Sequence, residues 1–161
     1  TVAQKEQFKL AQLKNELANV FEYCVIDTSP AFGALEESCF IASDEVINVL
    51  KLDRFSHDGL KTFKVNLDAM KKRYDNCYGV SVNGKPYLNK LILNENNNSI
   101  AQCRDLVAQY KTLEPSGYQI FVIPTDTGFR KAQTTSVPVQ AIAGPKKETL
   151  QALEEIAKAL K

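Results

Sequence analysis

Short apolar runs alternate with amphipathic segments along most of this chain, and this alternation limits the possible folds more than any other feature. The runs cover residues 23–27, 45–50, 88–93 and 118–123. Runs of this length are typical of strands buried on both faces of a parallel sheet, whose neighbouring strands are joined by helical crossovers. We therefore expect an α/β fold with a mostly parallel sheet and helices on both faces.

The segments between the runs carry apolar residues at helical spacing, with charged residues between them. We expect helices over the opening segment that carries Leu10, Leu13, Leu17 and Phe21, over residues 35–42, from about His57 to Met70 with Ser56 as the cap, after a Ser99 cap, and over residues 148–160. Asn83-Gly84 predicts a two-residue hairpin. Residues 94–98 and most of residues 125–145 are expected to be loops because their composition is polar.

Length and charge set the class of protein. With 161 residues and 44% hydrophobic content, residues 1–161 are expected to form a single α/β domain. The net charge of +1 gives no overall attraction to nucleic acid or membrane, so any DNA contact must come from a local patch. No apolar run approaches the roughly 18 residues of a membrane span, and no basic and apolar leader precedes the first helix. A cytoplasmic protein is therefore expected.

The cysteines give no sign of a metal centre. Cys24, Cys39, Cys77 and Cys103 lie far apart, form no C-x-x-C pair and have only His57 as a histidine co-ligand. Such spacing favours buried, reduced thiols over zinc ligands or disulfides.

The first apolar run ends abruptly in Asp27, followed by Thr28, Ser29 and Pro30. Open α/β sheets bind ligands at the carboxyl ends of their strands, and an aspartate placed there in a nucleotide-hydrolysing sheet holds Mg²⁺, usually through water. Taken alone, Asp27 is better interpreted as a carboxylate that caps the turn that follows it. No G-x-x-x-x-G-K-[ST] motif occurs in the 161 residues, so a candidate metal carboxylate stands without a phosphate-binding loop.

Three blocks, residues 27–33, 42–47 and 53–60, carry a family resemblance, and a fourth follows at residues 122–124 with its polar loop. Together they resemble the ParA/MinD family of deviant Walker ATPases, closest to the ParA-type plasmid and chromosome partition ATPases. The similarity runs through nearly the whole chain but corresponds to the carboxyl-terminal portion of a typical member. The resemblance implies a P-loop NTPase-like fold whose amino-terminal part, with the lysine-bearing loop, would precede Thr1.

The resemblance also implies roles for individual residues. Asp27 matches the catalytic Walker B aspartate, which would hold Mg²⁺ through water. The other matches are Thr28, Ser29, Pro30 and Gly33 as the phosphate-sensing second switch, Asn94, Pro124 and Thr125 as the base-binding residues, and Arg130, Lys131, Lys146 and Lys147 as DNA-binding residues. Relatives often have two consecutive prolines in the second switch, whereas this chain has Ser29 before a single Pro30, which constrains the backbone less.

By this resemblance, the intact protein would bind and hydrolyse ATP with Mg²⁺, form a homodimer, bind DNA non-specifically on the nucleoid and respond to a ParB-like centromere-binding protein. This chain alone is expected to be inactive. One alternative is a non-catalytic ParA-like interaction module. Another is a MinD-like membrane-cycling ATPase, but residues 148–161 carry three glutamates and no aromatic residue, which favours core packing and no stable membrane association.

Overall fold

The computed structural model describes residues 9–77 and 85–160. It divides into two compact units, the first formed by Thr1–Val46 with Lys61–Leu88 and the second by Ile47–Leu60 with Asn89–Lys161. The two units interleave along the chain, so they are not successive domains. The expectation of a single domain over residues 1–161 stays a prediction.

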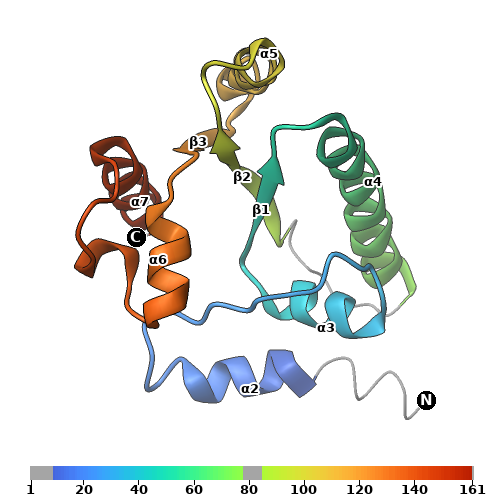
Figure 1. Ribbon diagram of the computed structural model, residues 1–161. Helices are drawn as coiled ribbons and strands as arrows, with labels where there is room; N and C mark the ends of the chain where they lie inside the picture. The colour runs from blue at the N-terminus through green and yellow to red at the C-terminus, as the bar shows by residue number, and fades with distance from the viewer. Residues whose placement is uncertain (1–8, 78–84, 161) are drawn as a thin grey trace. The chain divides into compact units, whose positions relative to one another are not determined.

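The strands are β1 (Glu45–Lys51), β2 (Tyr87–Asn96) and β3 (Gln119–Pro124), and their order in the sheet is β1-β2-β3 (Figure 1). β2 and β3 pair in parallel, with Lys90 opposite Gln119 and Leu93 opposite Val122. Leu91 and Leu93 of β2 are fully buried. The predicted α/β class, a parallel sheet flanked by helices, is confirmed.

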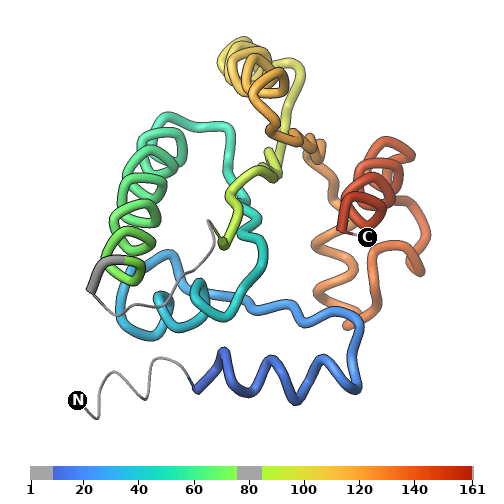
Figure 2. Tube along the Cα trace, turned by 180° about the vertical axis from the view of Figure 1, so that it is seen from behind, coloured from blue at the N-terminus to red at the C-terminus, as the bar shows by residue number. Residues whose placement is uncertain are grey.

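The helices are α2 (Lys9–Leu17), α3 (Ala34–Ala42), α4 (Arg54–Cys77), α5 (Ala101–Lys111), α6 (Gly128–Thr135) and α7 (Lys147–Ala159), with 3₁₀ turns η1 (Glu114–Ser116) and η2 (Val139–Ala141). Five of these helices were expected from the spacing of apolar residues. The prediction that residues 125–145 are mostly loop is wrong, because this segment contains α6, which lies beside α7 (Figures 1 and 2). The polar composition of this segment concealed α6. Within the helix, the hydroxyls of Thr134 and Thr135 donate to backbone carbonyls one turn earlier.

The core of the first unit lies between α3, β1 and α4. Phe40, Val46, Leu67, Met70 and Tyr74 are buried there, and further apolar side chains pack against them. Three of the aromatic rings, those of Phe32, Phe40 and Phe63, lie with centroids 5.3 to 5.8 Å apart. Such tilted and edge-on contacts between rings are favourable.

The strand expected at residues 23–27 is absent, so that prediction is wrong. Residues 23–29 belong to no helix or strand, and Val25 is 88% exposed. A strand needs a paired neighbour to satisfy its N–H and C=O groups, and none of the described strands pairs with this segment.

The predicted burial of the thiols is partly confirmed. Cys39 and Cys103 are buried, whereas Cys24 is exposed because the strand that would have buried it does not form. The side chain of Cys77 and the predicted hairpin at Asn83-Gly84 lie outside the described residues.

Two predicted helix caps are also wrong. α4 begins earlier than expected, and its cap is Asp53, whose Oδ1 accepts a 2.7 Å hydrogen bond from the Ser56 N–H. This N–H is the main cause of a pKa of Asp53 below its usual range. At the start of α5, the Ser99 hydroxyl donates to Asn97 Oδ1 at 2.6 Å and the N-cap position is Ile100.

Asp53→Ala is expected to lower the free energy of unfolding by about 0.5 to 2 kcal/mol, because it removes the side-chain cap of α4. Urea denaturation at neutral pH measures the loss, and Ser56→Ala should cost less, since it leaves the carboxylate on the backbone N–H. Because the pKa of Asp53 is lowered in the folded state, the cap contributes fully above the ordinary aspartate value of about 3.9 and fades as pH falls through the lower folded value. A larger loss in Ser56→Ala would contradict this assignment.

Candidate functional site

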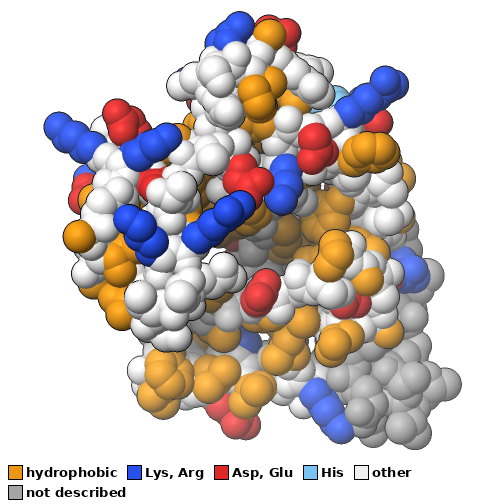
Figure 3. All heavy atoms as spheres, viewed as in Figure 1, with side chains coloured by type: hydrophobic (Ala, Val, Ile, Leu, Met, Phe, Trp, Pro, Cys, Tyr) orange, Lys and Arg blue, Asp and Glu red, His pale blue; other side chains and the backbone are white. Residues whose placement is uncertain are grey.

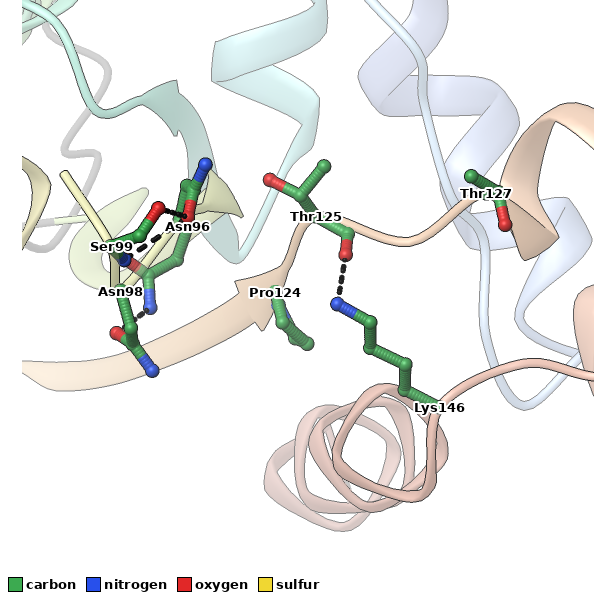
Figure 4. A pocket seen from close by; sticks show the side chains of 8 residues that line it. Asn96, Asn98, Ser99, Pro124, Thr125, Thr127 and Lys146 are labelled. Carbon is green, nitrogen blue, oxygen red and sulfur yellow. Dashed lines mark hydrogen bonds between the residues drawn. The ribbon is translucent and has the colours of Figure 1, made fainter.

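A pocket of about 450 Å³ lies at the carboxyl ends of β2 and β3, within the second unit (Figure 4). It is lined by Asn96, Asn97, Asn98, Ser99, Pro124, Thr125, Thr127 and Lys146. Its volume lies within the range of small-molecule sites. The carboxyl ends of adjacent parallel strands are also the place where open α/β sheets bind ligands.

A β-bulge at the end of β2 turns Asn96 toward this pocket. The register between β2 and β3 shifts between Leu93 and Asn96, and Glu95 has a φ of 59°. Leu91 and Leu93 are buried on alternate positions, but after the bulge Asn96 is buried and Glu95 is exposed. A positive φ in a residue other than glycine is costly, and such residues cluster at functional sites.

Asn96 lines the pocket and carries a buried acceptor without a partner among the described residues. The side chain is 8% exposed, and its Nδ2 donates to Asn98 Oδ1 at 2.8 Å. Its Oδ1 is buried and has no hydrogen-bond partner among the described residues. Leaving a buried acceptor without a partner costs about 1 to 3 kcal/mol. A ligand whose N–H formed a hydrogen bond with this oxygen would therefore bind more tightly.

Thr125 joins the ends of the two strands. Its N–H donates to the Asn96 carbonyl at 2.9 Å, and its hydroxyl donates to the Glu95 carbonyl at 3.0 Å. On the other side, Lys146 Nζ donates to the Thr125 carbonyl at 2.7 Å, so the lysine side chain reaches from the start of α7 to the loop after β3 (Figure 4).

Asp126 fastens the same loop to two helices. Its Oδ2 accepts hydrogen bonds from the Thr149 hydroxyl at 2.6 Å and the Lys146 N–H at 2.7 Å. Its Oδ1 accepts one from the Gly128 N–H at 2.7 Å. The Thr149 hydroxyl, followed by these N–H groups, holds the pKa of Asp126 below its usual range.

Two of the three predicted base-binding residues, Pro124 and Thr125, line the pocket. Asn94 lies inside β2, before the bulge, and the asparagine at the pocket is Asn96. In a regular strand Asn94 and Asn96 would lie on the same face, but the bulge between them breaks this alternation, and no local signal in the sequence predicts the bulge.

The predicted switch residues lie in the first unit, at the start of α3. The Ser29 hydroxyl donates to the Glu36 carboxylate, and the Gly33 N–H donates to Glu36 Oε2 at 3.1 Å. The Ser29 hydroxyl is the main cause of a lowered pKa of Glu36. Gly33 is the N-cap of α3, so this part of the predicted switch forms a helix cap, whereas Thr28 and Pro30 are exposed.

Asp27 is exposed and lies before the switch, in a segment that belongs to no helix or strand. Among the described residues, no group of three or more His, Cys, Asp or Glu side chains could hold a metal ion. Mg²⁺ keeps several of its waters in protein sites and is commonly held by one or two carboxylates with substrate phosphates. Among the described residues, the carboxylate of Asp27 does not form a complete metal site.

The predicted DNA-binding residues lie on α6 and at the start of α7. Arg130, Lys131, Lys146 and Lys147 are exposed, and Figure 3 shows Lys and Arg side chains over these two helices. Lys131 Nζ lies 3.7 Å from the position that a Cβ on Gly144 would occupy, just before α7. Lys146 differs from the other three because its ammonium is bonded at the pocket.

Residues 1–78 match a family model described as an AAA domain. The chain is also similar to the uncharacterized protein BBD21 of Borreliella burgdorferi, with 27% identity over 113 residues. That alignment covers 70% of this chain and 42% of the relative, so the chain spans less than half of the relative's length. The family match covers the first 78 residues and supports a P-loop NTPase-like fold. In the described part of the chain, the helices are too short or too polar to cross a membrane.

Proposed function

We propose, on the premise of the AAA-domain match, that this chain is part of a ParA-type partition ATPase and that its pocket holds the base of ATP. One observation carries this proposal. The pocket opens where two adjacent parallel strands end, and Pro124 and Thr125, the residues expected to face the base, line it.

The pocket offers the groups that a nucleobase requires. The Pro124 ring provides apolar surface for the flat face of a base. For its polar edge, the pocket has the unpartnered Asn96 Oδ1 as an acceptor and the Lys146 ammonium as a donor. An adenine edge carries an exocyclic amine beside ring nitrogens, which complements one acceptor and one donor.

The remaining features of the proposed protein follow from the resemblance. Asp27 would contact Mg²⁺ through water, and the intact protein would hydrolyse ATP as a homodimer stimulated by a ParB-like partner during plasmid or chromosome segregation. Exposed cations on α6 and α7 support non-specific contact with DNA phosphates on the nucleoid. Thr149 and Ala152 of α7 are buried and the helix contacts β3, which favours core packing over membrane binding.

Adenosine titration followed by amide NMR shifts tests the base pocket. A well-used nucleoside site gains about 0.3 kcal/mol per heavy atom, so we expect saturable shifts at the pocket residues with a Kd of roughly 0.1 mM. Asn96→Ala should weaken binding by roughly 2- to 10-fold because it removes the acceptor. Asn89→Ala is the matched control, since Asn89 lies on the same strand, also has an unpartnered Oδ1 among the described residues and is outside the pocket lining. Absence of saturable shifts at the pocket would refute the proposal.

A further inference from the structure

We infer that Asp126 is a positioning residue for the pocket, which holds the start of α7 so that the Lys146 ammonium stays on the Thr125 carbonyl, and that this arrangement sets the affinity for a nucleobase. The inference rests on the proposed function, because it concerns the same pocket. Asp126 does not line the pocket and acts through Lys146 and Thr125, which do.

The carboxylate of Asp126 is fixed from three directions. It accepts hydrogen bonds from the Gly128 N–H, the Lys146 N–H and the Thr149 hydroxyl, all at 2.6 to 2.7 Å. Hydrogen bonds to an ionised acceptor are short and stronger than neutral ones. Thr149 is completely buried, so water cannot compete for its hydroxyl. Asp126 therefore connects the loop after β3 firmly to the starts of α6 and α7.

These hydrogen bonds restrict the position of the Lys146 side chain. The backbone N–H of Lys146 donates to Asp126, and the Lys146 Nζ donates to the carbonyl of Thr125, the residue before Asp126. Thr125 is in turn bonded to the end of β2 at Glu95 and Asn96. A continuous series of hydrogen bonds thus runs from buried Thr149 to the asparagine that lines the pocket.

The fixed ammonium has donors to spare. A lysine ammonium has three N–H groups, and Thr125 uses one of them. Within the described part of the chain the other two have no partner, so they can donate to an acceptor in the pocket, such as a ring nitrogen of a base. Lys146 therefore belongs to the pocket, and the contacts proposed for DNA phosphates fall to Arg130, Lys131 and Lys147.

Variants at Thr149 separate positioning from packing. Thr149→Val keeps the shape of the side chain but removes the hydroxyl, whereas Thr149→Ser keeps the hydroxyl and removes a methyl group. In adenosine titrations of the whole chain, we expect Thr149→Val to bind roughly 3- to 10-fold more weakly and Thr149→Ser to bind like the parent chain. Asp126→Ala and Lys146→Met should each also weaken binding at least about 3-fold. Lys158→Met, in the last turn of α7 and outside the pocket lining, is the control without effect.

Each outcome decides the inference. Equal affinity of Thr149→Val, Lys146→Met and the parent chain would overturn it while leaving the base pocket intact. A loss in Thr149→Ser as large as that in Thr149→Val would assign Thr149 to packing and would also overturn it. If the parent chain itself gives no saturable shifts, the proposed function fails and this inference fails with it. Amide spectra of each variant show whether it is folded, and if Asp126→Ala is not, the Thr149 pair and Lys146→Met decide.

Discussion

Leu67→Ala is expected to lower the free energy of unfolding by about 2 to 5 kcal/mol. Such a loss is a large fraction of the total stability of a typical protein. Leu67 is 1% exposed and lies on α4 in the core with Phe40, Met70 and Tyr74. Truncation removes buried apolar surface and leaves a cavity, and the surrounding aromatic rings cannot fill it without moving.

Leu35→Ala is the matched control, because the same chemical change is made at a residue that is 72% exposed on α3. It should change the free energy of unfolding by less than about 1 kcal/mol, since little apolar surface is removed from a buried site. Urea denaturation followed by circular dichroism measures both variants. Similar losses in the two variants would mean that Leu67 does not lie in the core described for the first unit.

No ATP turnover above a protein-free control is expected from the chain of residues 1–161. The sequence contains no lysine-bearing glycine loop to hold the β- and γ-phosphates, and Asp27 would add negative charge near them. Removal of even one preorganised donor to a developing charge costs an enzyme about 10²- to 10³-fold in rate, so the loss of a whole loop should abolish turnover.

A coupled phosphate-release assay measures turnover, with Asp27→Ala as the control. Turnover that the substitution leaves unchanged would come from a contaminating ATPase. Turnover that the substitution abolishes would show that the loop is dispensable and that this chain is catalytic by itself. Binding of adenosine without turnover would agree with the proposed part of a partition ATPase, whereas absence of both would favour the non-catalytic interaction module.

Two residues that the sequence analysis expected at the base, Pro124 and Thr125, line the pocket, and the signal for the strand end beside them is local. Pro124 follows a run of apolar residues, which marks the end of a strand, and the resemblance of the surrounding block pointed to the base. In the structure β3 ends at Pro124, and Pro124 lines the pocket. Asp27 also follows such a run, yet its segment belongs to no helix or strand, because strand formation depends on a neighbouring strand and not on β-propensity alone.

The sequence by itself determined the α/β class and the positions of five helices and three strands, because apolar spacing repeats over a few residues and requires no distant partner. Only the tertiary structure decided the pocket. The bulge at Glu95 places Asn96, in place of Glu95, at the next buried position after Leu91 and Leu93, and Asn96 lines the pocket. Asp126 and the Lys146 N–H, 20 positions apart, are joined by a hydrogen bond, and Lys146 lines the pocket. Such contacts arise when separate elements pack together, which no short stretch of sequence encodes.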